Sequence, residues 1–110
     1  MYLRPRQIFE KFIVTRKESY LDARGNQRVE FKPAGDLFGV IASADPNEQE
    51  KFKALKHEVT HTIVQRLGNA RANVGDVLIN GARKFVVQAV DNPAGLGQWY
   101  IYYAKERFDL

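Results

Sequence analysis

The dipeptide Asn80-Gly81 constrains the fold of this chain more than any other feature of the sequence. It separates two runs rich in β-branched residues, DVLI (76–79) and ARKFVVQAV (82–90). Asn and Gly both tolerate positive φ, so this pair between apolar runs is the strongest short signal for a β-hairpin. The second half of the chain is therefore predicted to contain antiparallel β-structure.

Other short runs have strand character and are separated by turn residues. They are KFIVTRKE (11–18), QRVEF (27–31), DLFGVIAS (36–43), HEVTHTIVQR (57–66) and QWYIYYAKER (98–107), with turn chemistry in DARGN (22–26) and DNPAGLG (91–97). Strands this short, at this spacing, are typical of a closed or two-layered β-fold. We predict a mainly β domain, a small antiparallel β-barrel or sandwich of about six to seven short strands with one short helix.

The one strong helix signal covers residues 44–56, ADPNEQEKFKALK. Asp45 can cap the helix, Pro46 suits the first helical position, and Glu48 completes a capping box. Phe52 and Leu55 share one face, which is narrow. We expect a short helix on the surface of the domain.

Residues 57–61, His-Glu-Val-Thr-His, fit the H-E-x-x-H pattern of zinc hydrolases. That site needs a helix, on which the two histidines lie one turn apart and both reach the ion. In a strand, four residues span about 13 Å, whereas two nitrogens on one zinc ion lie within about 4 Å of each other. Five of the six residues in VTHTIV (59–64) are β-branched, which favours a strand. We predict no metal site here.

The composition offers no other catalytic chemistry. The chain has no cysteine, which excludes disulfides, iron–sulfur clusters and thiolate zinc sites. Ser19 and Ser43 lie in no nucleophile elbow, and no phosphate-binding glycine loop is present. We therefore predict a protein that is not an enzyme and needs no cofactor.

The net charge of +4 sits entirely in the first third of the chain. Residues 1–34 carry eight Lys or Arg and four Asp or Glu, which gives 8 − 4 = +4. A basic segment can contact phosphate or an acidic protein partner, and it can also be an ordinary solvated surface. We expect one domain over residues 1–110, with residues 1–7 as a flexible arm, no signal peptide and no membrane segment.

Five phrases, in this order, resemble the bacteriophage head-tail joining family, whose members are also called head-closure or stopper proteins. They are KFIVTRKESYLDARGNQRVEF, GDLFGVIASADPNEQEKFKA, EVTHTIVQR, GDVLINGARKFVVQAVDN and QWYIYYAKE, and together they span about Phe9 to Arg107. The apparent zinc motif falls on the Val-Thr-His strand of that family. Leu67, at the start of the loop 67–75, stands where the family often has Tyr.

The resemblance implies a virion neck component, assembled in the bacterial cytoplasm. Such proteins form a ring, usually dodecameric, between the portal or adaptor protein and the tail terminator or tail tube protein. The ring would retain packaged DNA, with transient DNA contact in its channel, and provide the docking surface for the tail.

Two sets of residues are candidates for these contacts. The resemblance makes the segment 43–56 a candidate channel loop or subunit contact, through Asp45, Glu48, Glu50, Lys51, Lys53 and Lys56, although it also reads as an ordinary capped surface helix. The candidate partner surface comprises Arg4, Arg6, Tyr100 and Tyr102. In the last strand, Trp99, Ile101 and Tyr103 would form the core while Tyr100 and Tyr102 face a partner; a core on both faces is the alternative.

Two other functions stay open. A small nucleic-acid-binding β-barrel would suit the basic first third, although such barrels usually place aromatics among basic residues, and residues 99–104 carry no charge. A tail-completion ring protein is closer to the first function, and sequence separates the two poorly.

Overall fold

The structure is a computed structural model that describes residues 9–44, 46–54, 58–66, 70–95 and 99–109. Within these ranges the chain forms six strands, one α-helix and one 3₁₀ turn. Their bounds are β1 Glu10–Leu21, β2 Gln27–Ser43, α1 Pro46–Ala54, β3 His61–Arg66, β4 Val77–Asn80, β5 Arg83–Asp91, η1 Pro93–Gly95 and β6 Trp99–Arg107.

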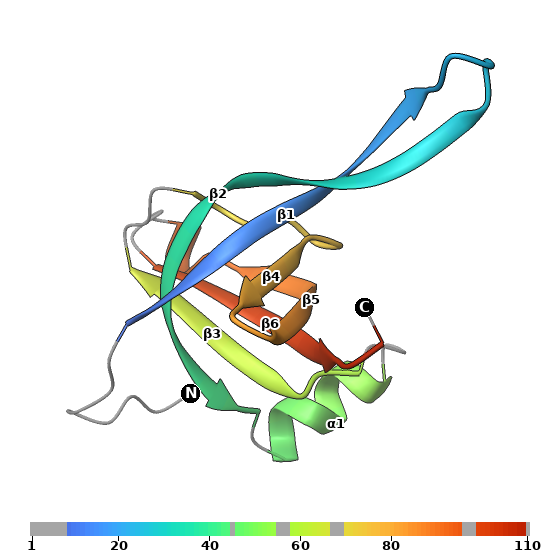
Figure 1. Cartoon of the computed structure of the whole chain (residues 1–110). Coiled ribbons are helices and arrows are strands. Elements are labelled where there is room, and N and C mark those ends of the chain that lie inside the picture. Colours follow the sequence, from blue (N-terminus) through green and yellow to red (C-terminus); the bar gives the residue numbers. More distant parts are fainter. Residues whose placement is uncertain (1–8, 45, 55–57, 67–69, 96–98, 110) are drawn as a thin grey trace.

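The strands close into an antiparallel barrel in the order β1-β2-β3-β6-β5-β4 (Figure 1). Closure occurs where residues 13–15 of β1 pair with residues 77–79 of β4. A closed barrel leaves no unpaired strand edge around its wall. The predicted mainly β fold is confirmed, and the structure selects the barrel over the sandwich.

The predicted β4–β5 hairpin is confirmed, with its turn one residue later than the Asn-Gly pair indicates. Asn80 pairs with Arg83 as the last residue of β4, so Gly81 and Ala82 form the loop. Gly81 has φ 60°, the left-handed conformation that glycine adopts without strain.

The two strands predicted at 27–31 and 36–43 are one continuous strand, β2. Pro33 and Gly35 do not end it, because β2 has a strand partner there only on the β1 side and Pro33 need not donate a hydrogen bond. The pairing register shifts by one residue at this point, since Val14 pairs with Gly35 and Thr15 with Pro33. A β-bulge thus absorbs the irregular residues, and the strand count falls to six.

All six strands contribute side chains to the barrel core. The largest fully buried side chains there are Tyr102, Phe12, Phe85, Leu37, Ile63 and Leu78. Phe12 and Phe85 meet edge to face, with ring centroids 6.0 Å apart. These contacts join β1 to β5 across the interior and fix which face of each strand points inward.

A smaller apolar cluster lies apart from this core. Ala44 and Val59, which flank the helix region, are buried and pack with Ala89 and Tyr103. The helix α1, residues 46–54, lies inside the predicted range 44–56 and at the end of the barrel near the start of β3 (Figure 1). No helix in the described ranges has the length and apolar character that a membrane crossing requires.

Candidate assembly surfaces

The β1–β2 pair continues well past the barrel as a two-stranded ribbon, which we define as residues 16–32. Past Thr15, β1 has no strand neighbour except β2, and β2 joins β3 only from Gly39 onward. The ribbon extends the molecule to 53 × 31 × 30 Å and stands away from every other element (Figure 1). It is the most prominent surface feature of the described chain.

The pairing register gives the ribbon two different faces. Lys17 opposes Phe31, Ser19 opposes Val29 and Leu21 opposes Gln27, so these six residues share one face. The exposed fractions of Leu21, Val29 and Phe31 are 72%, 51% and 47%. We call this the apolar face of the ribbon.

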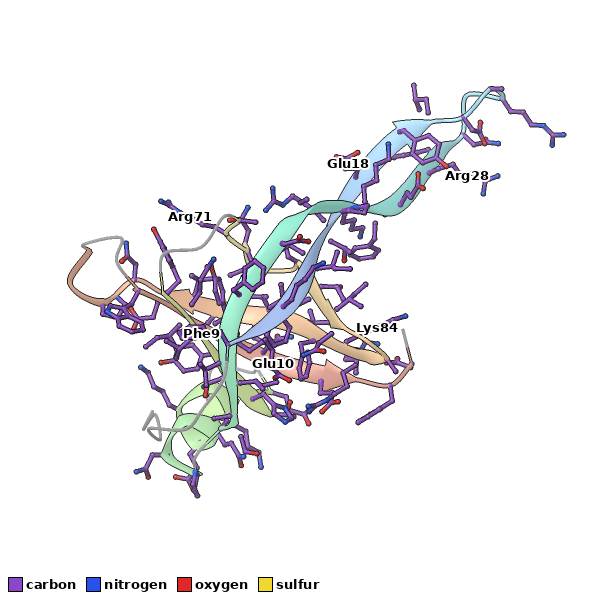
Figure 2. All side chains as sticks on the ribbon, turned by 60° about the vertical axis from the view of Figure 1, so that its left-hand side comes forward. Phe9, Glu10, Glu18, Arg28, Arg71 and Lys84 are labelled. Atoms are coloured by element: carbon purple, nitrogen blue, oxygen red, sulfur yellow. The ribbon has the colours of Figure 1, made fainter. Side chains whose placement is uncertain are left out.

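The opposite face is charged. It carries Arg16, Glu18, Tyr20, Arg28, Glu30 and Lys32, and Figure 2 labels Glu18 and Arg28 on the ribbon. Lys32 Nζ lies 3.4 Å from Glu18 Oε2, and both side chains are about half exposed. Exposed pairs of this kind contribute little to stability, so they mainly keep this face solvated.

The turn at the tip is held by Asp22, as the DARGN signal predicts. Its carboxylate accepts hydrogen bonds from the backbone N–H groups of Arg24 and Asn26, each at 2.9 Å, and from Arg28 Nε at 3.0 Å. The hydrogen bond from Arg28, with those from the backbone, lowers the pKa of Asp22 below its ordinary value. The tip is therefore locally ordered although it contacts no other part of the described barrel.

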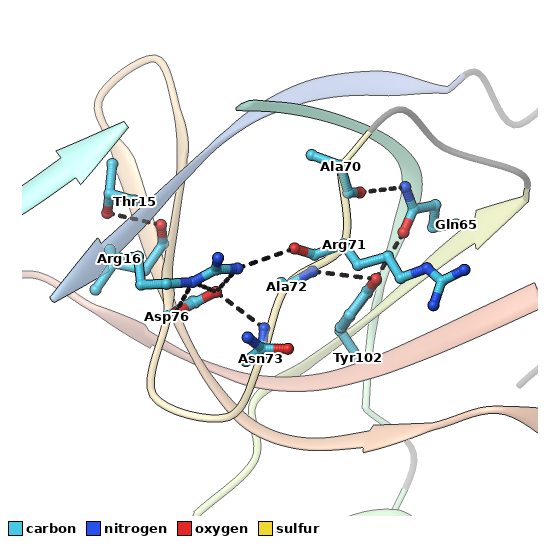
Figure 3. A network of polar contacts seen from close by, with 10 residues as sticks. Thr15, Arg16, Gln65, Ala70, Arg71, Ala72, Asn73, Asp76 and Tyr102 are labelled. Carbon is cyan, nitrogen blue, oxygen red and sulfur yellow. Dashed lines mark hydrogen bonds and ion pairs between the residues drawn. The ribbon is translucent and has the colours of Figure 1, made fainter. Parts of the chain in front are cut away.

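The base of the ribbon is tied to the barrel by Arg16 and Asp76 (Figure 3). Arg16 Nη2 donates to Asp76 Oδ2 at 3.0 Å and to the carbonyl of Arg71 at 3.3 Å. Asp76 is nearly buried and also accepts the backbone N–H of Asn73 at 2.9 Å. Beside it, the Thr15 hydroxyl donates to the carbonyl of Val77 at 2.9 Å. These bonds fix where the ribbon leaves the barrel.

A buried polar chain holds the same loop, residues 70–76, from the core side (Figure 3). The Tyr102 hydroxyl donates to Gln65 Oε1 at 2.6 Å and accepts the backbone N–H of Ala72 at 3.3 Å. Gln65 Nε2 donates to the carbonyl of Ala70 at 2.7 Å. Burial raises the pKa of Tyr102 above its ordinary value, so the hydroxyl stays protonated and able to donate.

The last strand faces the other way from the sequence prediction. Tyr102 is fully buried and Tyr100 is 8% exposed, both in the barrel core, whereas Trp99, Ile101 and Tyr103 are partly exposed. The reason is register: Tyr102 opposes the buried Ile63, and Ala104 opposes Val87. The assignment of Tyr100 and Tyr102 to a partner surface is therefore wrong.

The predicted channel segment lies partly outside the described residues, because Asp45 and Lys56 are not among them. Arg4 and Arg6 of the candidate partner surface also lie outside the described residues. Glu50, Lys51 and Lys53 are exposed on α1, with both lysines in its last turn. Glu48 belongs to α1, but its side chain is not described. The lysines stand near the negative end of the helix dipole, which suits cations.

The described part of the apparent zinc motif, residues 58–61, does not form a helix. Residues 58–60 have no regular structure and His61 begins β3, while His57 lies outside the described residues. His61 Nε2 instead lies 3.8 Å from Glu106 Oε2, and burial lowers the pKa of His61. Glu106 is held by Arg83, whose Nε and Nη2 donate to its two oxygens at 2.9 and 3.0 Å. The predicted strand is confirmed from His61 onward.

Sequence reasoning missed the ribbon, although its signal is visible in retrospect. The strand character of residues 11–18 runs on through Glu18-Ser19-Tyr20-Leu21 to the Asp22 turn without a break. Residues 16–21 and 27–32 pair only with each other and have no third strand beside them. Only the closed barrel shows that each of the other strands already has a partner on both sides.

Solved structures of other proteins share the fold of this chain at low sequence identity. No family model matches the chain, and no curated protein matches it. The solution structure of protein SF1141 from Shigella flexneri 2a is similar, with a TM-score of 0.73 and 11% identity over 98% of this chain and 100% of that one. A chain in the virion of a native gene transfer agent particle is also similar, with a TM-score of 0.58 and 20% identity over 96% of this chain and 99% of that one. At these identities the two likenesses show that the chain shares its fold with both structures.

Proposed function

We propose that this chain is a non-enzymatic virion neck component. It forms a ring between the portal or adaptor protein and the tail, retains packaged DNA and provides the docking surface for the tail. The observation that carries the proposal is the likeness in fold, over nearly the whole of both chains, to a component of a gene transfer agent virion. The family resemblance of the sequence phrases points the same way.

The surface of the described chain has features that suit assembly. They are a projecting ribbon with an apolar face and an exposed helix with two lysines. Subunits of a symmetric ring need surfaces of this kind for contact with their copies.

The direct test uses particles from a host that carries this gene, with and without a deletion of the gene. Mass spectrometry counts the copies of the chain in each particle, and electron microscopy shows whether heads keep DNA and carry tails. A copy number typical of a ring, together with tailless heads that lose DNA in the deletion, would support the proposal. Full heads with joined tails in the deletion would refute it.

Within this function, α1 is our candidate for the part that meets DNA. Lys51 and Lys53 are exposed in its last turn and can contact phosphate. The double variant Lys51→Gln/Lys53→Gln should assemble into particles that lose DNA faster than wild type. Glu50→Gln, on the same helix, is the matched control and should retain DNA, because it removes a negative charge. Equal retention by the two variants would exclude α1 as the DNA contact.

A nucleic-acid-binding barrel is the second candidate, favoured by the charge of the ribbon. Residues 16–32 carry five basic and three acidic side chains, a net charge of 5 − 3 = +2. Binding of the purified chain to DNA with an affinity that falls steeply with salt would favour this function. Affinity that is weak at low salt would count against it.

A further inference from the structure

Six of the ten exposed large hydrophobic side chains in the described residues gather in two groups on the β1–β2 pair. Three of them, Leu21, Val29 and Phe31, form the apolar face of the ribbon. Three others lie at the barrel end of the same pair of strands and are 46%, 38% and 41% exposed: Phe9, Ile13 and Phe38. We call this second group the outer wall.

The outer wall follows from the same register as the ribbon. Ile13 pairs with Asp36 and Lys11 with Phe38, so Ile13 and Phe38 are diagonal neighbours on the face that points away from the core. Phe12 and Leu37, between them in sequence, are fully buried on the inner face. Phe9 comes just before β1, at the position that Figure 2 labels.

These two surfaces cannot cover each other within one molecule. Ile13 and Leu21 belong to the same strand and lie eight residues apart, about 26 Å at the usual rise of a strand. Alternation along β1 also places them on the same face, so they do not face each other. Within the described residues, neither surface is therefore covered by the other.

The sizes of the two surfaces match each other. Three half-exposed side chains in each group present on the order of 300 Å² of apolar surface, taking roughly 200 Å² for a whole large side chain. Joined with their polar rims, they approach the roughly 800 Å² per partner of a standard stable interface. A two-stranded ribbon is marginal alone in water and gains stability from packing against another layer.

One ion pair is also available between the two surfaces. Lys17 is the one charged residue among the six on the apolar face of the ribbon. On the outer wall, Asp36 opposes Ile13 and has a half-exposed side chain 3.7 Å from Lys11 Nζ. A ribbon laid on the wall can bring its Lys17 to the Asp36 carboxylate of the other copy.

We propose that the apolar face of the ribbon of one copy packs on the outer wall of the next copy. Leu21, Val29 and Phe31 then contact Phe9, Ile13 and Phe38 of the neighbour. Because the two surfaces differ, the contact is head to tail, and repetition by rotation closes a ring. The closure of that ring rests on the proposed neck function, whereas the contact itself does not.

The absence of cysteine from the sequence allows a clean cross-linking test. Ser19→Cys places a thiol on the apolar face of the ribbon, and Lys11→Cys places one beside Phe38 on the outer wall. The two single variants are mixed as concentrated purified protein and treated with a short bismaleimide. Glu18→Cys, one residue away on the charged face of the ribbon, replaces Ser19→Cys in the control mixture. The double variant Ser19→Cys/Lys11→Cys is treated in assembled particles.

A cross-linked dimer from Ser19→Cys with Lys11→Cys, and a ladder of multimers from the double variant, would support the contact. Cross-linking in neither preparation would overturn it, as would equal cross-linking by the Glu18→Cys control. Predominant cross-linking of Ser19→Cys to itself would also overturn it, because the ribbons would then pack on each other. The deletion experiment decides the neck function separately, since head filling and tail joining do not depend on where the copies touch.

Two adjacent substitutions test the chemistry of the contact. In the Ser19→Cys background, Val29→Lys puts a charge on the apolar face, whereas Glu30→Lys changes the charged face. Val29→Lys should lower the yield of the cross-link to Lys11→Cys about tenfold, the effect of one lost apolar anchor. Glu30→Lys should leave the yield within about twofold. Both residues are exposed, so both variants should fold; equal yields would overturn the proposal.

Discussion

Replacing Tyr102 with Phe tests whether the last strand is oriented as the structure shows. Tyr102 is fully buried, and its hydroxyl donates to Gln65 Oε1 at 2.6 Å. Phe keeps the ring and removes the hydroxyl alone, so packing should hardly change. A tyrosine on a partner surface, as the sequence indicated, would tolerate this change in the free chain almost without effect.

The expected magnitude follows from the groups left behind. Loss of the hydrogen bond costs about 1 kcal/mol, and the buried, unsatisfied Gln65 oxygen adds about 1–2 kcal/mol. The Ala72 N–H, 3.3 Å from the hydroxyl, loses a longer and weaker bond that adds little. We expect Tyr102→Phe to lower the free energy of unfolding by about 2–3 kcal/mol, or the Tm by about 10 °C for a domain of this size.

Urea unfolding, monitored by circular dichroism, measures this change. An unaltered slope m would show that the surface area exposed on unfolding is the same in the variant. The matched control is Tyr20→Phe, on the exposed charged face of the ribbon, which should change the free energy by less than about 0.5 kcal/mol. Equal small effects of the two substitutions would refute the buried hydrogen-bond chain and the orientation of β6.

Three further outcomes are expected from the structure. Gly35→Ala should lower the free energy of unfolding in urea by about 1–3 kcal/mol, because Gly35 has φ +127° and an added Cβ would lie 2.9 Å from Ala70 Cβ. Wild-type stability would mean that β2 does not pass so close to the loop 70–76. The hydrogen bond from Arg83 lowers the pKa of Glu106 below its ordinary value of 4.5, so the ionised Glu106 stabilises the fold above that pH and this contribution is lost as the pH falls. Glu106→Gln should therefore reduce the loss of stability between about pH 7 and about pH 3. An unchanged loss would contradict this role. Neither zinc nor EDTA should change the Tm, because the chain is irregular before His61 and a strand after it; a shift of several degrees on adding zinc would revive the metal site.

The positions of turns and strands could be predicted because their signals are local. Asp22 and Gly25 set the tip of the ribbon through backbone hydrogen bonds and a positive φ within the turn itself. The β-branched run before Gln65 likewise favours a strand over a helix through its own χ1 restrictions. No distant residue is needed for either inference.

The helix and the candidate channel residues were predictable only in part. Pro46 and the charged residues that follow define α1 from the sequence, and Glu50, Lys51 and Lys53 are exposed on it. Whether these lysines meet DNA depends on how copies are arranged around an axis. That arrangement is a property of the assembly and has no local signal.

The sequence by itself determined a mainly β chain with one short helix, the Asn80-Gly81 hairpin and the strand in place of a zinc helix. Only the tertiary structure decided that β2 runs unbroken past Pro33 and that Tyr102 points inward, because both depend on which strand lies opposite. The strand β6 has apolar side chains on both faces, so its sequence does not show which face is buried. Its register with β3 and β5 decides this. The ribbon likewise follows from closure of the barrel. The strands β1 and β2 are longer than the stretches that pair with β4 and β3, so their remaining residues extend past the barrel.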